Sequence, residues 1–218
     1  MFDNKNKSSF NNSMSDNFYK NGEYRRPQKW LLSLRADLYL NQILHLVQIS
    51  SDYHILEVGC DSGQLTELLK KRTHSVVGID INPIPVNNSG KDYLRVMDAQ
   101  ELSFPDRSFN LVVSAHTIEH LPNVLKALCE FERVLRPGGF LILIYPWEPI
   151  RGYTLLPEAL LYYRSIKKCR QIHLHSFTPR KIDRLLIGSS LVQRNWRIFF
   201  VPHPNFISVL HKNVKISK

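Results

Sequence analysis

The sequence predicts an α/β fold, a doubly wound and mainly parallel sheet with helices on both faces. Short apolar runs alternate with amphipathic helical stretches along most of the 218 residues, which is the pattern of βαβ units. A glycine turn, residues 59–63, separates the first of these runs from the helix that follows it. A later run, residues 140–144, is continuously apolar, which is typical of a strand covered on both faces. The sequence contains no internal repeat and no sign of a second domain.

Hydrophobic periodicity gives the order of the expected elements. Apolar side chains recur about every 3.6 positions over residues 30–49, which predicts a helix that packs at the sheet edge and covers a ligand. The expected strands cover residues 55–58, 76–79, 93–97, 111–114, 140–144, 191–201 and 206–210. The further helices are expected over residues 64–71, 123–135, 155–168 and 178–186. The second of these ends at Arg136-Pro137-Gly138-Gly139, because proline cannot continue a helix.

Composition divides the chain into an arm and one domain. Residues 1–26 are rich in Asn, Ser and Lys and are expected to be a disordered arm, whereas residues 27–218 form a single domain. No apolar run approaches the roughly 18 residues of a membrane span, and the first residues lack the apolar segment of a secretory signal. The three cysteines are widely spaced, without a metal-binding pattern. We therefore expect a cytoplasmic protein without a structural metal.

The net charge of +10 is unevenly distributed. Residues 27–150 hold eleven basic and fourteen acidic side chains, whereas residues 151–218 hold thirteen basic side chains and only two acidic ones. Such an asymmetry suggests an anionic partner for the basic part: nucleic acid, acidic lipid or a phosphorylated substrate. A solvated basic surface that only aids solubility explains the same charges.

The glycine turn and a later acidic residue predict a nucleoside-containing cofactor. A tight turn between strand and helix lets backbone N–H groups approach a ligand closely. Asp80 ends the second apolar run, about 20 positions after the turn, where a carboxylate can hold ribose hydroxyls. The turn lacks the GxGxxG spacing of nicotinamide dehydrogenases, which makes that class a weaker alternative.

Five elements in register resemble the class I S-adenosylmethionine-dependent methyltransferases, and most closely the group called methyltransferase type 11. They are Glu57-Val58-Gly59-Cys60-Asp61-Ser62-Gly63, Asp80, Asp98-Ala99, FPDRSFNLVVSAHTIEHL (104–121) and RVLRPGGFLILI (133–144). The resemblance implies a Rossmann-like methyltransferase fold with S-adenosylmethionine as cofactor. It also implies a cofactor half at residues 50–145 and a basic, substrate-side region at residues 146–218.

The resemblance implies roles for individual residues around the loop. Glu57 would close the first strand and support the loop, although it could also only satisfy backbone amides. The segment from Gly59 through Cys60 and Asp61 to Gly63 would wrap the methionine part of the cofactor. Asp61 replaces a glycine of the family pattern, and Asp tolerates left-handed backbone better than most residues. Its carboxylate would either face the cation of the cofactor or crowd the site.

The resemblance also assigns the sugar, the base and the transferable methyl. Asp80 would accept hydrogen bonds from both ribose hydroxyls. Ile81 would pack on adenine, and Asp98 would accept from the adenine amino group beside the Ala99 backbone, unless it only caps the next turn. Ser114 and the residues up to His116 would border the methionine end.

Methyl transfer needs positioning and, where the acceptor must lose a proton, a general base. His116 and His120 are the candidate catalytic residues, and Glu119 could orient one of them. Capping of the following helix is the structural alternative for both histidines. His173 and His175 are expected to contact substrate or to mark the entry to a helix, and no metal site is expected.

The sequence leaves three functions open. The leading one is methyl transfer to a small-molecule or lipid-linked acceptor, which could be anionic, with peripheral membrane contact through the basic region. The second is methylation of RNA, with the basic region as its footprint. The third is a catalytically silent protein of the same fold that binds a partner.

Overall fold

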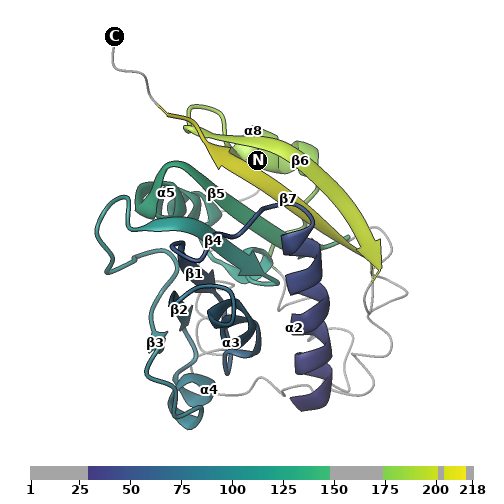
Figure 1. Cartoon of the computed structure of the whole chain (residues 1–218). Coiled ribbons are helices and arrows are strands. Elements are labelled where there is room, and N and C mark those ends of the chain that lie inside the picture. The colour runs from purple at the N-terminus through teal and green to yellow at the C-terminus, as the bar shows by residue number, and fades with distance from the viewer. Residues whose placement is uncertain (1–28, 148–173, 201–203, 215–218) are drawn as a thin grey trace, which may run out of the picture.

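The computed structural model describes residues 29–147, 174–200 and 204–214, and within them seven strands form one sheet in the order β3-β2-β1-β4-β5-β7-β6 (Figure 1). The strands are β1 (His54–Val58), β2 (Ser75–Asp80), β3 (Leu94–Val96), β4 (Phe109–Ala115), β5 (Leu135–Pro146), β6 (Leu191–Phe200) and β7 (Pro204–Lys212). Only β7 runs antiparallel to its neighbours β5 and β6. The predicted doubly wound, mainly parallel sheet is therefore confirmed.

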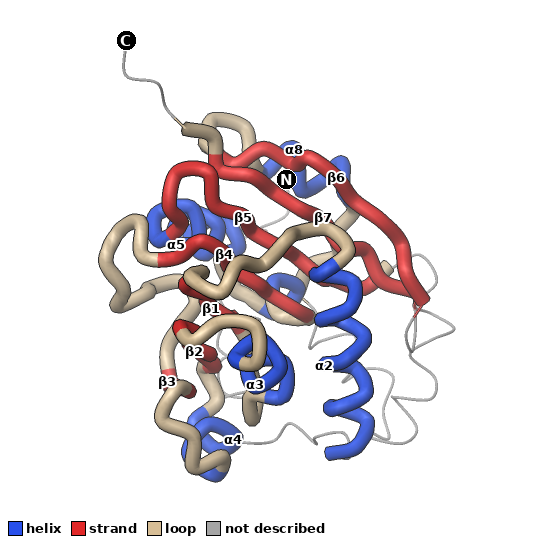
Figure 2. Tube along the Cα trace, viewed as in Figure 1, coloured by secondary structure: helices blue, strands red, loops and turns tan. Residues whose placement is uncertain are grey.

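The helices lie on both faces of this sheet. They are α2 (Lys29–Leu44), α3 (Gln64–Lys70), α4 (Pro83–Asn88), α5 (Val124–Val134), α8 (Pro179–Leu185) and the 3₁₀ turn η1 (Ile118–His120). Figure 2 shows α2 and α3 in front of the sheet and α5 and α8 behind it. The two layers bury separate apolar cores, one on each face.

The sequence had suggested that helix α2 packs at the edge of the sheet, which is wrong, because the helix packs on a face of the sheet. Tyr39 and Ile43 of α2 share a buried cluster with Ile55 of β1, Leu111 of β4 and Ile142 of β5, all in the middle of the sheet. The apolar stripe of a helix shows that it is buried, but the stripe does not say against which part of the sheet. This placement brings α2 next to the loop that follows β1.

Two short elements were not predicted. In α4, the Asn82 side chain accepts a hydrogen bond from the Ile84 N–H at 3.1 Å, and proline occupies the first helical turn. An Asn followed by proline is a helix start that the sequence displays, so α4 could have been recognised. The 3₁₀ turn η1 has only three residues and no periodic signal. The predicted helix over 155–168, the arm at 1–26 and the last residue of the 191–201 strand lie outside the described residues.

The sheet order places a crevice at one end of the molecule. Strand β1 pairs with β2 on one side and with β4 on the other, so the connections leaving β1 and β4 diverge. Ligands of open α/β sheets bind at such a switch point, outside the carboxyl ends of the strands. No helix of the described part of the chain is long and apolar enough to cross a membrane.

Candidate cofactor and active site

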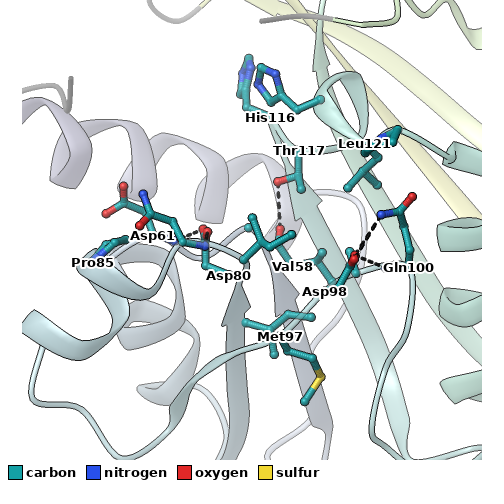
Figure 3. Close-up of a pocket in the computed structure, with 17 residues that line it drawn as sticks. Val58, Asp61, Asp80, Pro85, Met97, Asp98, Gln100, His116, Thr117 and Leu121 are labelled. Atoms are coloured by element: carbon teal, nitrogen blue, oxygen red, sulfur yellow. Dashed lines mark hydrogen bonds between the residues drawn. The ribbon is translucent and has the colours of Figure 1, made fainter. Parts of the chain in front are cut away.

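Two adjoining cavities open at the carboxyl ends of β1, β2 and β4. Figure 3 shows the residues of the first one. Several residues singled out from the sequence line the first cavity: Gly59, Asp61, Asp80, Ile81, Asp98, Ala99, His116 and His120. The second cavity lies under α2 and is lined by Glu57 and Cys60 together with Arg35 and Tyr39 of that helix. Gly59, Asp61 and His116 line both cavities and thus mark their junction.

The loop between β1 and α3 depends on left-handed backbone. Gly59 has φ +79°, and a Cβ atom there would lie 1.9 Å from Oγ1 of Thr117. Gly63 has φ +77°, and a Cβ atom there would meet Leu94 at 2.7 Å. Asp61 has φ +50°, as the tolerance of Asp for this conformation had suggested. The loop therefore keeps its tight course although an aspartate replaces a glycine.

Asp80 fastens this loop to the end of β2. Its carboxylate accepts hydrogen bonds from the backbone N–H groups of Asp61 and Asn82, both at 2.9 Å. In Figure 3, Asp61 and Asp80 stand on one side of the cavity and Asp98 and Gln100 on the other. The carboxylate is thus held rigidly in the cavity wall, at the end of the second strand where the sequence placed it.

Asp98 caps the next turn and also lines the cavity. Its Oδ1 atom accepts from the Gln100 backbone N–H at 2.8 Å and from the Gln100 side-chain amide at 3.1 Å. Ala99 beside it is buried. The two roles weighed for Asp98 therefore do not compete, because the cap fixes the carboxylate while the side chain still borders the cavity.

Glu57 is a buried carboxyl beneath the loop. The Thr66 hydroxyl donates a hydrogen bond to it. Burial raises the pKa of Glu57 to about 8, with a smaller contribution from the negative charge of Asp80, while the Thr66 hydrogen bond acts in the opposite direction. Burial also raises the pKa of the Cys60 thiol, which keeps this thiol protonated and unreactive.

His116 and His120 flank one buried carboxylate. Oε1 of Glu119 lies 3.2 Å from Nδ1 of His116 and 3.9 Å from Nε2 of His120. His116 has a left-handed backbone with φ +51°, and its ring stacks on Tyr39 with 5.8 Å between centroids. The expectation that Glu119 could orient a histidine thus has a geometric basis. Ser114, expected to border the methionine end of the cofactor, is fully buried within β4 and lines neither cavity, whereas Ala115 and His116, which follow it, line the second cavity.

His175 anchors a distant segment to the site. Its Nε2 atom lies 2.9 Å from the backbone oxygen of Leu121, and the backbone N–H groups of Leu174 and His175 donate to the Glu119 carbonyl at 2.9 and 3.1 Å. Burial lowers the pKa of His175, which favours a neutral ring that donates this bond. Its position marks the entry to α8, one of the two roles expected for it, and His173 lies outside the described residues.

Sequence reasoning missed the residues that α2 brings to the site and Thr117, which precedes η1. Arg35 and Tyr39 come from a helix that precedes the glycine loop by some twenty positions, and only tertiary packing places them there. Thr117 closes the loop from the other side, since its hydroxyl donates to the Val58 carbonyl at 3.1 Å. Within the described residues, no group of three or more His, Cys, Asp or Glu side chains could hold a metal ion.

The fold and the two cavities define an α/β domain that binds a nucleoside-containing cofactor at its switch point. A family model described as a methyltransferase domain matches residues 56–143. A demethylmenaquinone methyltransferase of Tropheryma whipplei is 28% identical over 127 residues, which cover 56% of this chain and 52% of that protein. A phthiotriol/phenolphthiotriol dimycocerosates methyltransferase of Mycobacterium ulcerans is 35% identical over 154 residues, covering 62% and 56%.

A solved structure extends the similarity beyond the matched residues. Geranyl diphosphate C-methyltransferase from Streptomyces coelicolor A3(2), in complex with Mg²⁺, geranyl-S-thiolodiphosphate and S-adenosyl-L-homocysteine, superposes with a TM-score of 0.63 at 15% identity, covering 83% of this chain and 76% of that one. The chain spans about half the length of the curated relatives it matches. Residues 56–143 thus match a methyltransferase domain, and the solved structures of similar fold include an S-adenosylmethionine-dependent methyltransferase and an enzyme in complex with S-adenosyl-L-homocysteine. The resemblance found in the sequence is confirmed.

Proposed function

We propose that the protein transfers the methyl group of S-adenosylmethionine to a small-molecule or lipid-linked acceptor. The observation that carries the proposal is the fixed carboxylate of Asp80 at the cavity wall, next to a loop whose Gly59 leaves no room for a side chain. When bound, S-adenosylmethionine supplies a methyl group on a sulfonium, which has a neutral thioether as its leaving group. The residues of the two cavities have only to bind, orient and shield the reactants.

The first cavity fits the adenosine part of the cofactor. We assign the ribose hydroxyls to Asp80, because a carboxylate accepts two hydrogen bonds from a diol. Adenine would lie between Ile81 and Ala99, with its amino group toward Asp98. The methionine part would extend across the junction at Gly59 and Asp61 into the second cavity.

The charges of the two cavities suit a cofactor with cationic groups. Glu57, Asp61 and Asp80 lie close enough for the charges of Asp80 and Asp61 to raise the pKa of Glu57. An ammonium and a sulfonium relieve such repulsion, whereas a dinucleotide pyrophosphate would increase it. Arg35 is a basic side chain in the wall of the second cavity and suits the carboxylate of the methionine part.

The acceptor class rests on the relatives. Their names describe a menaquinone precursor, phthiotriol lipids and a fatty acid as substrates. The basic surplus of residues 151–218 suits an anionic acceptor or contact with anionic lipid. A cytoplasmic location, as the scattered cysteines indicate, is part of the same proposal.

Calorimetric titration with S-adenosylmethionine tests the cofactor site. We expect Asp80→Ala to lower the affinity about a hundredfold or more, since it removes two hydrogen bonds to a charged acceptor, while the circular dichroism spectrum is retained. Asp92→Ala, an exposed aspartate, is the control and should bind as the wild type does. A 2′,3′-dideoxy analogue of S-adenosylhomocysteine should bind wild type weakly, and Asp80→Asn should discriminate less against it. Unchanged affinity of Asp80→Ala would contradict the ribose assignment.

A labelling experiment identifies the acceptor. The protein is incubated with methyl-labelled S-adenosylmethionine and a fractionated cell extract, and the label is followed into lipid, small molecules and RNA. Label in lipid or small molecules supports the proposal, whereas label in RNA would replace its acceptor class. A wild type that neither binds the cofactor nor transfers label would be the silent protein of the third hypothesis.

A further inference from the structure

A buried carboxylate stands behind the two histidines of the first cavity. Glu119 is 0% exposed, although burial of a carboxylate is costly unless hydrogen-bond donors face it. Its Oε1 atom is 3.2 Å from Nδ1 of His116 and 3.9 Å from Nε2 of His120, and both histidines line the cavity. The carboxylate therefore faces rings that border the site and not only the core of the fold.

The main chain of Glu119 has a structural role that does not need its side chain. Its carbonyl oxygen accepts the N–H groups of Leu174 and His175 and so connects the segment before α8 to η1. Any residue at this position offers the same carbonyl. The carbonyl therefore does not explain why this position holds a glutamate whose buried side chain faces two histidines.

His116 is held in an unusual conformation at the junction of the two cavities. Its backbone is left-handed at φ +51°, a conformation that costs a residue with a Cβ atom about 1–2 kcal/mol. Such strain is found most often at functional sites, where the surrounding structure supports it. In Figure 3, His116 stands above Thr117, over the side chains that we assign to the cofactor. Because Nδ1 faces Glu119, the other ring nitrogen, Nε2, is directed away from the carboxylate.

We propose that Glu119 is a positioning residue that holds His116 with a proton on Nδ1, so that Nε2 accepts the proton of the methyl acceptor. A carboxylate only accepts hydrogen bonds, so the ring nitrogen facing it carries the proton and the opposite nitrogen keeps its lone pair. The carboxylate also stabilises the imidazolium that forms during transfer. This inference deepens the proposed function and rests on it.

The proposed dyad defines the class of acceptor. In the step, the bond between the nucleophilic atom and its hydrogen breaks, the proton goes to Nε2 of His116, and the freed electron pair forms the bond to the methyl carbon as the sulfonium leaves as a thioether. Charge balances, because an imidazolium replaces the sulfonium as the cation. The acceptor is then a hydroxyl, an enol or an acidic C–H, all of which must lose a proton, and not a tertiary amine or a thioether.

Nitrogen NMR of the histidine rings tests the positioning role without any acceptor. In ¹⁵N-histidine-labelled protein, we expect His116 of the wild type to carry its proton on Nδ1. In Glu119→Ala, which lacks the partner, the proton should move to Nε2, while exposed His74 stays unchanged in both proteins. Glu119→Gln keeps the size and an accepting oxygen, so the Nδ1 proton should remain but resonate upfield once the bond loses its charge. If Glu119→Ala does not fold, the Gln variant carries the test.

Turnover of the labelled acceptor fraction provides the second measurement. His116→Asn should lower turnover 10²–10⁴-fold, the usual contribution of a general base, and Glu119→Gln should lower it at least tenfold. Glu101→Gln, with a side chain 84% exposed, is the matched control and should keep wild-type turnover. A His116 ring that keeps its Nδ1 proton in Glu119→Ala, or full turnover in His116→Asn, would overturn the inference. Absence of cofactor binding in the wild type would instead overturn the proposed function.

Discussion

Two regions of the molecule differ in where the backbone is left-handed and in what surrounds those positions. The cofactor rim, formed by residues 59–63, 80–82, 98–100 and 116–120, contains several left-handed positions: Gly59, Asp61, Gly63 and His116. The antiparallel end, formed by β5, β7, β6 and α8, has seven consecutive residue pairs joining β5 to β7 from Phe140 to Pro146 and one register shift in β6, between Gln193 and Asn195. Its left-handed positions, Gly138 and Gly188, are glycines with no atom within 4 Å of an added Cβ. Left-handed backbone in the rim is thus adopted by residues with a Cβ atom or by crowded glycines, whereas in the antiparallel end it is adopted by glycines with open surroundings.

The two regions also treat buried polar groups differently. In the antiparallel end, the buried Tyr145 hydroxyl meets Oγ of Ser208 at 2.8 Å, inside the fold. In the rim, the carboxylates of Asp80 and Asp98 are fixed by backbone N–H groups yet border a cavity. A polar group that is held in place but faces a cavity is ready for a ligand, and this distinguishes the site from the scaffold.

The largest expected effect compares two left-handed glycines, one with open surroundings and one whose neighbours leave no space for a Cβ atom. Gly59→Ala should abolish measurable cofactor binding and lower the free energy of unfolding by about 3 kcal/mol or more, because its Cβ atom would lie 1.9 Å from Thr117. Gly138→Ala has the same φ of +79° with no atom within 4 Å, so it should lose only about 1–2 kcal/mol and keep cofactor binding. Urea denaturation and calorimetry measure both quantities. Equal losses in the two variants would show that crowding at Gly59 is unimportant.

The next effect should be confined to the antiparallel end. Glu132 of α5 accepts hydrogen bonds from the hydroxyls of Ser189 and Ser190, both at 2.6 Å, and from the Ser190 N–H at 2.9 Å. Although burial alone would raise it, these bonds leave the pKa of Glu132 below its usual range. Glu132→Ala should lower the free energy of unfolding by about 2–3 kcal/mol, because three donors lose a charged acceptor. Glu101→Ala, at an exposed residue, is the control. A change in the cofactor affinity of Glu132→Ala would show that the antiparallel end and the cofactor rim are coupled.

The sequence predicted the parts of the molecule that local pattern determines. Each predicted strand exists, because apolar runs bounded by turn residues leave few alternatives. Gly59 and Asp61 of the glycine loop lie together with Asp80 and Asp98 around one cavity. The predicted helix over 123–135 is α5, which begins after Asn123, whose side chain caps it by accepting from the Lys126 N–H at 3.0 Å. These features depend on neighbours in sequence and on the parallel order of strands.

Long-range packing was not predictable in the same way. The amphipathic pattern of α2 shows that one side is buried, but only the fold shows that this side meets the middle of the sheet and brings Arg35 to the second cavity. Ser114 illustrates a second limit. The sequence shows that this residue lies near the end of a strand, but it does not show that the side chain is buried within the fold. The sequence predicted that Glu119 could orient one of the two histidines, since all three residues lie in one short segment, and the structure shows that the nearer one is His116.

The smallest of the three effects is a dependence of stability on pH that originates in the rim. The pKa of Glu57 is about 8 in the folded chain against about 4.5 when unfolded. Between these values the folded state binds one proton more, so stability should fall as pH rises through this window, and below pH 4.5 the effect should vanish. Glu57→Gln is neutral throughout and its amide oxygen can still accept from Thr66, so its stability relative to wild type should rise by about 2 kcal/mol from pH 6 to 8. Urea denaturation over this range measures the difference, with Glu101→Gln expected to follow the wild type. Parallel curves for Glu57→Gln and wild type would mean that the carboxyl beneath the loop is already ionised at neutral pH, and that the acidic rim tolerates its full charge without a bound cation.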